Sequence, residues 1–130
     1  MKELSIENIK TDLSLNSNGV YKIFLYKDGK PMSISRFLET DKTGLVYIGA
    51  AEKTKLSYRL TCFLNSKNSE KKQNNHSGVD KIKQNEKLKK IISKLVFMYQ
   101  ITVTEDAKEQ ERRTLKEYVK HFGEVPPLNG

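Results

Sequence analysis

The chain has 130 residues, a formal net charge of +8 and one cysteine, Cys62. This length is typical of one domain with one hydrophobic core. A single cysteine excludes a disulfide framework and a cysteine-rich zinc site, and Cys62 is expected to be a small buried side chain. No apolar run approaches the roughly 18 residues of a membrane span, and the first residues lack the apolar stretch of a signal peptide. We therefore expect a cytoplasmic protein with no membrane partner. Its basic charge predicts a polyanionic partner, most often nucleic acid.

The first part of the chain predicts a short helix followed by extended segments. Ser5 is a suitable N-cap for a helix over residues 6–13, which the polar sequence NSNG ends. Residues 1–18 are therefore expected to form a helical extension ahead of the core. Asp28-Gly29 predicts a tight hairpin turn, and TDKTG at 40–44 predicts a second turn. The extended segments around these turns are expected at residues 19–26, 31–39 and 45–49.

The next segment, residues 54–64, has the periodicity of an amphipathic helix. Leu56, Leu60 and Phe63 lie at i, i+4 and i+7. Arg59 falls on the same stripe. An arginine on an apolar face either extends to the edge of that face or binds a buried anion.

The segment that follows is polar and basic. Residues 65–75 predict a loop, and residues 79–93 predict a helix with an apolar side and a lysine-rich side. A solvated lysine face and a face that contacts nucleic acid are equally consistent with this pattern. The side chains expected near phosphates are Arg59, Lys67, Lys71, Lys72, Lys83 and Lys87.

The end of the chain predicts a strand and a last helix. Apolar residues alternate over 95–103, as in a half-buried strand. Thr104 is the expected N-cap of the helix, which we expect to end at about His121, a favourable partner of the helix dipole, before Gly123. With no repeat and no linker, the pattern predicts a single α+β domain over residues 1–130.

Glu111 is placed on the inward face of the last helix by its spacing. Leu115, Tyr118 and Phe122 form the apolar stripe, and Glu111 lies one turn before Leu115. A carboxylate in an apolar environment costs free energy unless it is paired or holds a cation. A salt bridge with Arg59 and a metal site are the two alternatives.

These unusual residues together suit the hydrolysis of a phosphodiester. One carboxylate can hold a divalent cation that polarises a phosphoryl oxygen. Arginine binds phosphate through its planar fork, and a tyrosine can relay a proton from the attacking water. Tyr21 and Tyr47 both lie near glycines, Gly19 and Gly49, which leave room for backbone or substrate.

The order of these residues resembles the GIY-YIG nuclease family. GVY, which ends on Tyr21, and YIG, which begins at Tyr47, are similar to its two short motifs. The helix after the second motif carries Arg59. The sequence ERRTL places Glu111 in a later helix, and PPLN ends on Asn129. Five elements therefore occur in the family's order.

This resemblance covers residues 19–129 and implies a small three-stranded, mainly antiparallel sheet flanked by helices. It also implies an endonuclease that uses Mg²⁺ or Mn²⁺ to cut DNA, with RNA as an alternative, and leaves 5′-phosphate and 3′-hydroxyl ends. The resemblance implies that Tyr47 activates the attacking water and that Tyr21 is its companion. It also implies that Arg59 contacts the phosphate, that Glu111 binds the metal and that Asn129 supports the site.

Three residues keep other interpretations open. Ala50 follows YIG, where many family members have lysine or serine, and Phe63 stands where members often have histidine or tyrosine. A catalytically silent nucleic-acid-binding module on the same fold is therefore one alternative. A nuclease active only as a homodimer or in a larger assembly is another. His76 is either an accessory catalytic residue or a solvated loop histidine.

Overall fold

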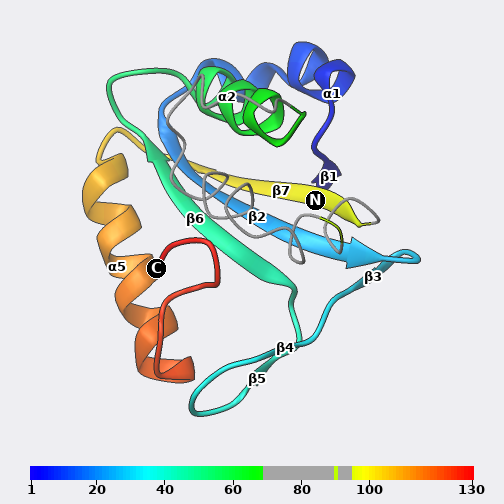
Figure 1. Ribbon diagram of the computed structural model, residues 1–130. Helices are drawn as coiled ribbons and strands as arrows, with labels where there is room; N and C mark the ends of the chain where they lie inside the picture. The colour runs from blue at the N-terminus through cyan, green and yellow to red at the C-terminus, as the bar shows by residue number, and fades with distance from the viewer. Residues whose placement is uncertain (69–89, 91–94) are drawn as a thin grey trace.

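The computed structural model describes residues 1–68, 90 and 95–130, which form an antiparallel sheet with helices on both faces (Figure 1). The strands of this sheet are β1 Lys2–Glu3, β2 Gly19–Lys27, β3 Lys30–Pro31, β6 Leu45–Ala51 and β7 Val96–Val103. A second sheet pairs β4 Ile34–Ser35 with β5 Thr40–Asp41. The helices are α1 Ile6–Thr11, the 3₁₀ helix η1 Leu13–Asn16, α2 Leu56–Asn68 and α5 Ala107–Phe122. The α+β class and the mainly antiparallel sheet are confirmed, but the sheet has five strands rather than the expected three, because the two-residue strands β1 and β3 extend it.

The central strand of the sheet is β2. It pairs with β7 along one edge and with β6 and then β3 along the other, and β1 extends the sheet beyond β7. Its run of apolar residues suits a strand that is buried on both faces. The predicted hairpin turn is confirmed: Asp28 and Gly29 have φ of 53° and 77°. Positive φ at both residues is what a two-residue type I′ turn requires, and it pairs Lys27 with Lys30.

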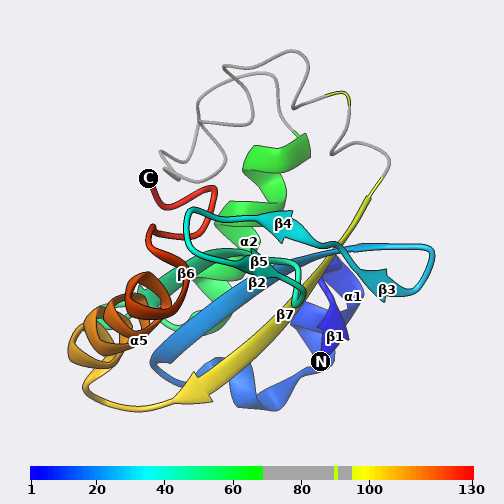
Figure 2. The ribbon, with the colours of Figure 1, turned by 90° about the horizontal axis from the view of Figure 1, so that it is seen from below.

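Each face of the sheet has its own apolar cluster. Helices α1 and α2 cover one face, and α5 packs against β6 and β2 on the other. Figure 2 shows that α5 lies under one side of the sheet and leaves the β7 side without a helix from the described residues. The first cluster includes Leu15, Tyr21, Ile23, Leu56, Leu60 and Phe63. The second is formed by Val20, Phe24, Leu45, Ile48 and Tyr118.

The amino-terminal segment is more than a helical extension. The Ser5 cap is confirmed, because its hydroxyl accepts a hydrogen bond from the Asn8 N–H at 3.1 Å. Strand β1 was not predicted; it pairs with β7 through Lys2 and Glu3. A two-residue exposed strand has no apolar alternation, so sequence periodicity does not detect it.

Two predicted helix boundaries are wrong. Helix α2 continues to Asn68, so residues 65–68 are helical rather than part of a loop. Thr104 is not the N-cap of α5, which begins at Ala107 after Asp106. The Thr104 hydroxyl instead accepts a hydrogen bond from the Asp106 N–H at 3.2 Å and shapes the turn before the helix. The helix ends at Gly123 as predicted.

The predicted turn at 40–44 is partly strand, because β5 pairs with β4. Asp41, the second residue of β5, is fully buried. Its carboxylate accepts hydrogen bonds from the Thr43 N–H at 2.8 Å, the Thr43 hydroxyl at 2.6 Å and the Tyr118 hydroxyl at 2.7 Å. These three donors compensate its desolvation and tie β5 to α5.

None of the helices in the described residues is long and apolar enough to cross a membrane. The predicted basic helix over 79–93 lies outside the described residues, apart from Lys90.

Candidate active site

Tyr21 and Tyr47 lie on neighbouring strands and pack in the cluster under α2. In the β2–β6 register Tyr21 is opposite Gly49, and Tyr47 is opposite Ile23. The pairing register then shifts, because Phe24 lies opposite Leu45 and Val46 is left without a partner on β2. This bulge bends β6 directly beside Tyr47. The two tyrosine rings are 6.0 Å apart between centroids. Tyr21 is fully buried, whereas Tyr47 keeps 8% of its surface exposed.

The glycines beside these tyrosines make room for the protein's own atoms. A Cβ on Gly49 would overlap the Tyr21 ring, at 2.5 Å from the hydroxyl oxygen and 2.8 Å from Cε1. A Cβ on Gly19 would overlap the backbone carbonyl of Thr102 on β7. Of the two alternatives expected at these glycines, backbone or substrate, the backbone of β7 takes the room at Gly19, whereas the Tyr21 ring takes it at Gly49.

Arg59 approaches the tyrosines from α2. The apolar residues of its stripe are fully buried and Arg59 is half-buried, which confirms the predicted face. Burial raises the pKa of the Tyr21 hydroxyl and so does the charge that Tyr47 can carry, whereas the charge of Arg59 and its hydrogen bond with Tyr21 lower it. Tyr21 is thus held protonated at neutral pH, next to a guanidinium group.

Glu111 is half-buried on α5, which packs against β6 and β2, and its charge acts on the Tyr21 hydroxyl. Burial raises the pKa of its carboxyl; the positive charges of Lys108 and Arg59 oppose this, and the charge of Glu52 adds to it. No ion pair among the described residues joins Glu111 to Arg59. Of the two alternatives for Glu111, the salt bridge with Arg59 is therefore not formed, because Arg59 is hydrogen-bonded to Tyr21 instead. A partly desolvated carboxylate without an ion pair is suited to bind a cation.

Sequence reasoning missed Glu52 and Lys108, whose charges act on Glu111. Lys108 lies one helical turn before Glu111, a spacing that the sequence shows. Glu52 directly follows β6, and its role appears only because β6 packs against α5. Within residues 1–68, 90 and 95–130 no three His, Cys, Asp or Glu side chains gather as a metal cage. Glu111 would therefore supply a single carboxylate.

Asn129 closes the outer edge of β6 beside Tyr47. Its Oδ1 accepts a hydrogen bond from the Ile48 N–H and its Nδ2 donates to the Ile48 carbonyl, both at 2.9 Å. The Leu128 N–H donates to the Val46 carbonyl at 2.9 Å. The Asn129 side-chain amide thus satisfies the backbone N–H and carbonyl of Ile48, as a neighbouring strand would. Asn129 is thereby fixed to β6, the strand that carries Tyr47.

Replacing Asn129 with alanine should lower the free energy of unfolding by about 1–3 kcal/mol, because the buried edge of Ile48 loses its partners. Amide hydrogen exchange at Ile48 should accelerate. Asn8→Ala, which removes an exposed bond to the Glu3 carbonyl, is the matched control and should leave Ile48 unchanged. Equal protection of Ile48 in wild type and Asn129→Ala would contradict this role.

Of the remaining predicted residues, Cys62 and His121 lie in the described part of the chain. Cys62 is buried, as expected. His121 lies in the last turn of α5, as expected, and its Nε2 also lies 3.0 Å from the Glu39 carboxylate. The predicted residues whose side chains lie outside the described part are Lys67, Lys71, Lys72, His76, Lys83 and Lys87.

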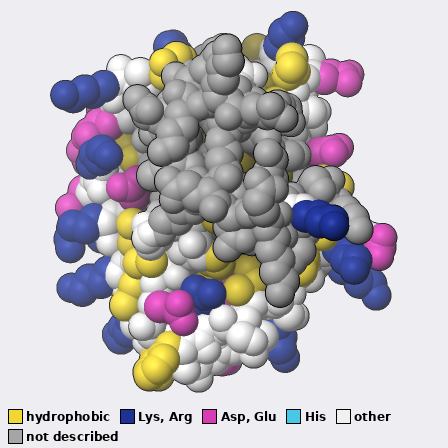
Figure 3. All heavy atoms as spheres, in the orientation of Figure 1, with side chains coloured by type: hydrophobic (Ala, Val, Ile, Leu, Met, Phe, Trp, Pro, Cys, Tyr) yellow, Lys and Arg dark blue, Asp and Glu magenta, His cyan; other side chains and the backbone are white. Residues whose placement is uncertain are grey.

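The outward side of α5 carries a basic surface that the sequence analysis did not predict. Figure 3 shows its Lys and Arg side chains along the left edge. Arg112 and Arg113 pair with Glu109 at 2.7 and 3.1 Å. Hydrogen bonding from Arg112 is the main cause that lowers the pKa of Glu109 to about 2. The exposed basic residues of this surface are Lys108, Arg112, Arg113, Lys116 and Lys120.

No family model matches the chain, and no curated protein or solved structure matches it. The candidate site therefore rests on its own residues and their arrangement.

Proposed function

We propose that the protein is a divalent-metal-dependent endonuclease of the GIY-YIG type that hydrolyses DNA phosphodiester bonds. The observation that carries the proposal is the convergence of Tyr21, Tyr47, Arg59 and Glu111 from two strands and two helices. These four positions are far apart in the chain and are the four to which the sequence resemblance assigns catalytic roles. The basic charge of the chain suits a DNA substrate.

The Glu111 carboxylate fits a hard divalent cation such as Mg²⁺ or Mn²⁺, which prefers oxygen ligands. Its partial burial and the absence of an ion pair among the described residues are the features that support this fit. A bound metal would polarise a phosphoryl oxygen and stabilise the charge that develops there. One protein carboxylate is sufficient for Mg²⁺, which commonly keeps several waters and uses phosphate oxygens as further ligands.

Arg59 and the two tyrosines have distinct parts in this proposal. Arg59 donates hydrogen bonds to the scissile phosphate through its planar fork. Tyr47, which keeps some exposure to solvent, relays the proton of the attacking water. Tyr21 is fully buried and held protonated, so it orients Arg59 and Tyr47.

A catalytically silent nucleic-acid-binding module is the second candidate. Ala50 is half-exposed beside the site and has no polar group to contribute. Phe63 is fully buried, with its ring 6.2 Å from that of Tyr47, so it packs the site without moving protons. A nuclease that is active only in a larger assembly is the third candidate.

A nicking assay on supercoiled plasmid distinguishes these three candidate functions. The purified protein should nick it in Mg²⁺ or Mn²⁺ but not in EDTA, and DNA ligase should reseal the nicks because the ends are 5′-phosphate and 3′-hydroxyl. Salt-sensitive DNA binding without nicking would favour the silent module. Nicking that appears only after a partner is added would favour the assembly subunit.

A further inference from the structure

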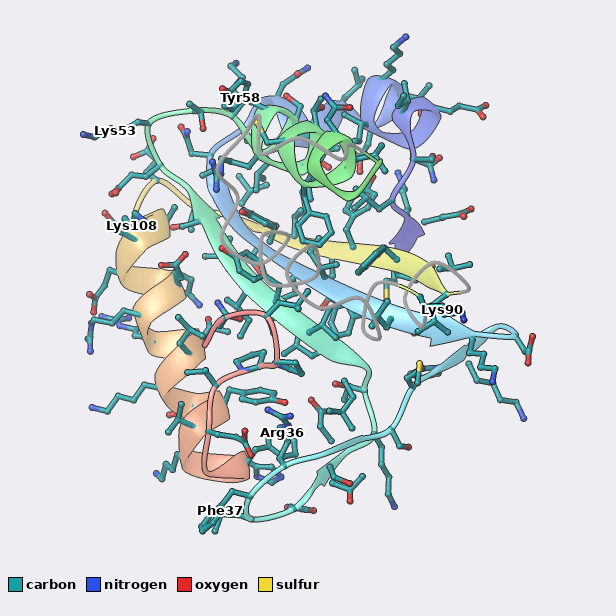
Figure 4. The ribbon with its side chains drawn as sticks, viewed as in Figure 1. Arg36, Phe37, Lys53, Tyr58, Lys90 and Lys108 are labelled. Carbon is teal, nitrogen blue, oxygen red and sulfur yellow. The ribbon has the colours of Figure 1, made fainter. Side chains whose placement is uncertain are left out.

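The loop between β4 and β5 exposes two large apolar side chains. Phe37 is 81% exposed and Leu38 is 62% exposed. Figure 4 shows Phe37 at the end of this hairpin, away from the sheet and next to the end of α5, where a Cβ on Gly123 would lie 3.2 Å from the Phe37 Cβ. We call Phe37 and Leu38 the hairpin tip. Ordered apolar side chains that project in this way are typical of an interaction site.

The hairpin tip is held in place by polar contacts with the end of α5. The Leu38 N–H donates to the Phe122 carbonyl at 2.9 Å. Arg36 donates to the Glu124 carboxylate at 2.9 Å and to the Val125 carbonyl at 3.1 Å. The His121 Nε2 lies 3.0 Å from the carboxylate of Glu39, the residue that follows the tip. Because the tip is already ordered, a partner that covers it loses little conformational entropy on binding.

The same chain carries an apolar groove on the face of the sheet that α5 covers only in part (Figure 2). The groove has a volume of about 550 Å³. Aromatic side chains from the sheet and α5 line it, and two lysines lie at its border. The aromatic residues are Phe24, Tyr26, Tyr118 and Phe122, and the lysines are Lys22 and Lys42.

We propose that the hairpin tip of one copy inserts into the groove of a second copy, so that the protein forms a two-fold symmetric dimer. Glu39 and Glu124 are exposed beside the tip, where Glu39 contacts His121 and Glu124 pairs with Arg36. Because exposed ion pairs contribute little free energy, both carboxylates can exchange these partners for the lysines at the groove. Phe122 lines the groove and also bonds to the hairpin. Tip and groove are therefore adjacent, and one two-fold axis can bring each tip to the other groove in a self-complementary contact.

This inference does not depend on the proposed nuclease activity, since neither tip nor groove includes Tyr21, Tyr47, Arg59 or Glu111. Insertion of the tip into its own groove is inconsistent with the exposure of Phe37 and Leu38. A second copy supplies the apolar side chains and the opposite charge together.

The oligomeric state of the full chain tests the proposal, measured by sedimentation velocity over a range of concentrations. Wild type should dimerise, and Phe37→Ser should increase the dimer dissociation constant at least about tenfold. Leu13→Ser is the matched control, because Leu13 is 79% exposed on η1, away from the hairpin; it should dimerise as wild type does. A monomeric wild type at concentrations up to about 1 mM, or equal dimerisation by Phe37→Ser, would overturn the proposal.

Charge reversal provides a second test that does not alter apolar residues. Lys42→Glu should weaken the dimer, whereas Lys10→Glu, an exposed reversal on α1, should not. Adding Glu39→Lys to Lys42→Glu should restore part of the lost association. If Phe37→Ser instead weakens DNA binding and leaves self-association unchanged, the tip contacts nucleic acid and the dimer proposal is wrong.

Discussion

Replacing Tyr47 with phenylalanine is expected to slow metal-dependent DNA cleavage by about 10²–10⁴-fold, the usual contribution of a positioned proton-transfer group. The substitution removes one hydroxyl and keeps the ring. Its packing against Tyr21 and Phe63, at centroid distances of 6.0 and 6.2 Å, is therefore preserved. Single-turnover cleavage rates at saturating protein measure the effect on the chemical step.

Tyr99→Phe is the matched control for the loss of a hydroxyl in the same apolar cluster. The Tyr99 hydroxyl donates to the Asp12 carboxylate at 2.8 Å, so its loss should cost about 1 kcal/mol of stability without a change in cleavage rate. Equal cleavage by Tyr47→Phe and wild type would remove Tyr47 from the mechanism.

Replacing Gly49 with alanine is expected to destabilise the protein by about 1–3 kcal/mol, because the added methyl overpacks the core. The methyl would overlap the Tyr21 ring, which is fully buried and therefore has little space to move. Displacement of Tyr21 should also move Arg59, its hydrogen-bond partner, and so reduce cleavage. Urea denaturation and the nicking rate measure the two effects.

A double-mutant cycle with Tyr21→Leu tests whether the clash is the cause. Leucine lacks the ring that the new methyl meets, so the double variant should be more stable than the sum of the single effects predicts. Cleavage should stay low in the double variant because Tyr21 is absent. Additive stability losses would show that Gly49 matters for another reason.

Local chemistry made much of the fold predictable. Ser5 caps α1, and Asp28-Gly29 turns β2 into β3, because short-range hydrogen bonds and positive φ decide both features. The apolar stripes of α2 and α5 likewise placed Arg59 and Glu111 on inward faces before their partners were known.

Contacts between distant segments were not predictable in the same way. The pairing of Asn129 with Ile48 and the burial of Asp41 beside Tyr118 join residues far apart in the chain. The bulge at Val46 is a property of two strands together. Helical spacing placed Arg59 and Glu111 inward but did not show that Arg59 bonds to Tyr21 and that Glu111 has no ion pair among the described residues.

Glu111→Gln should keep the protein folded and raise its free energy of unfolding by about 0.5–1 kcal/mol at neutral pH, as often occurs when a functional group is removed. Burial raises the pKa of Glu111, so the ionised carboxylate disfavours folding above that pKa. The gain should therefore disappear as the pH falls below the ordinary glutamate range. Solvent screening at this half-exposed position keeps the effect small.

The rate of plasmid nicking by Glu111→Gln in Mg²⁺, compared with Glu117→Gln, tests the central claim most directly. Glu117 lies on the same helix but is exposed, so its variant controls for the loss of a carboxylate from α5. We expect a loss of at least about 10²-fold for Glu111→Gln, because the metal ligand is removed, and wild-type nicking for Glu117→Gln. Nicking by folded Glu111→Gln at the wild-type rate would contradict the assignment of Glu111 as the metal ligand and, with it, the proposed active site.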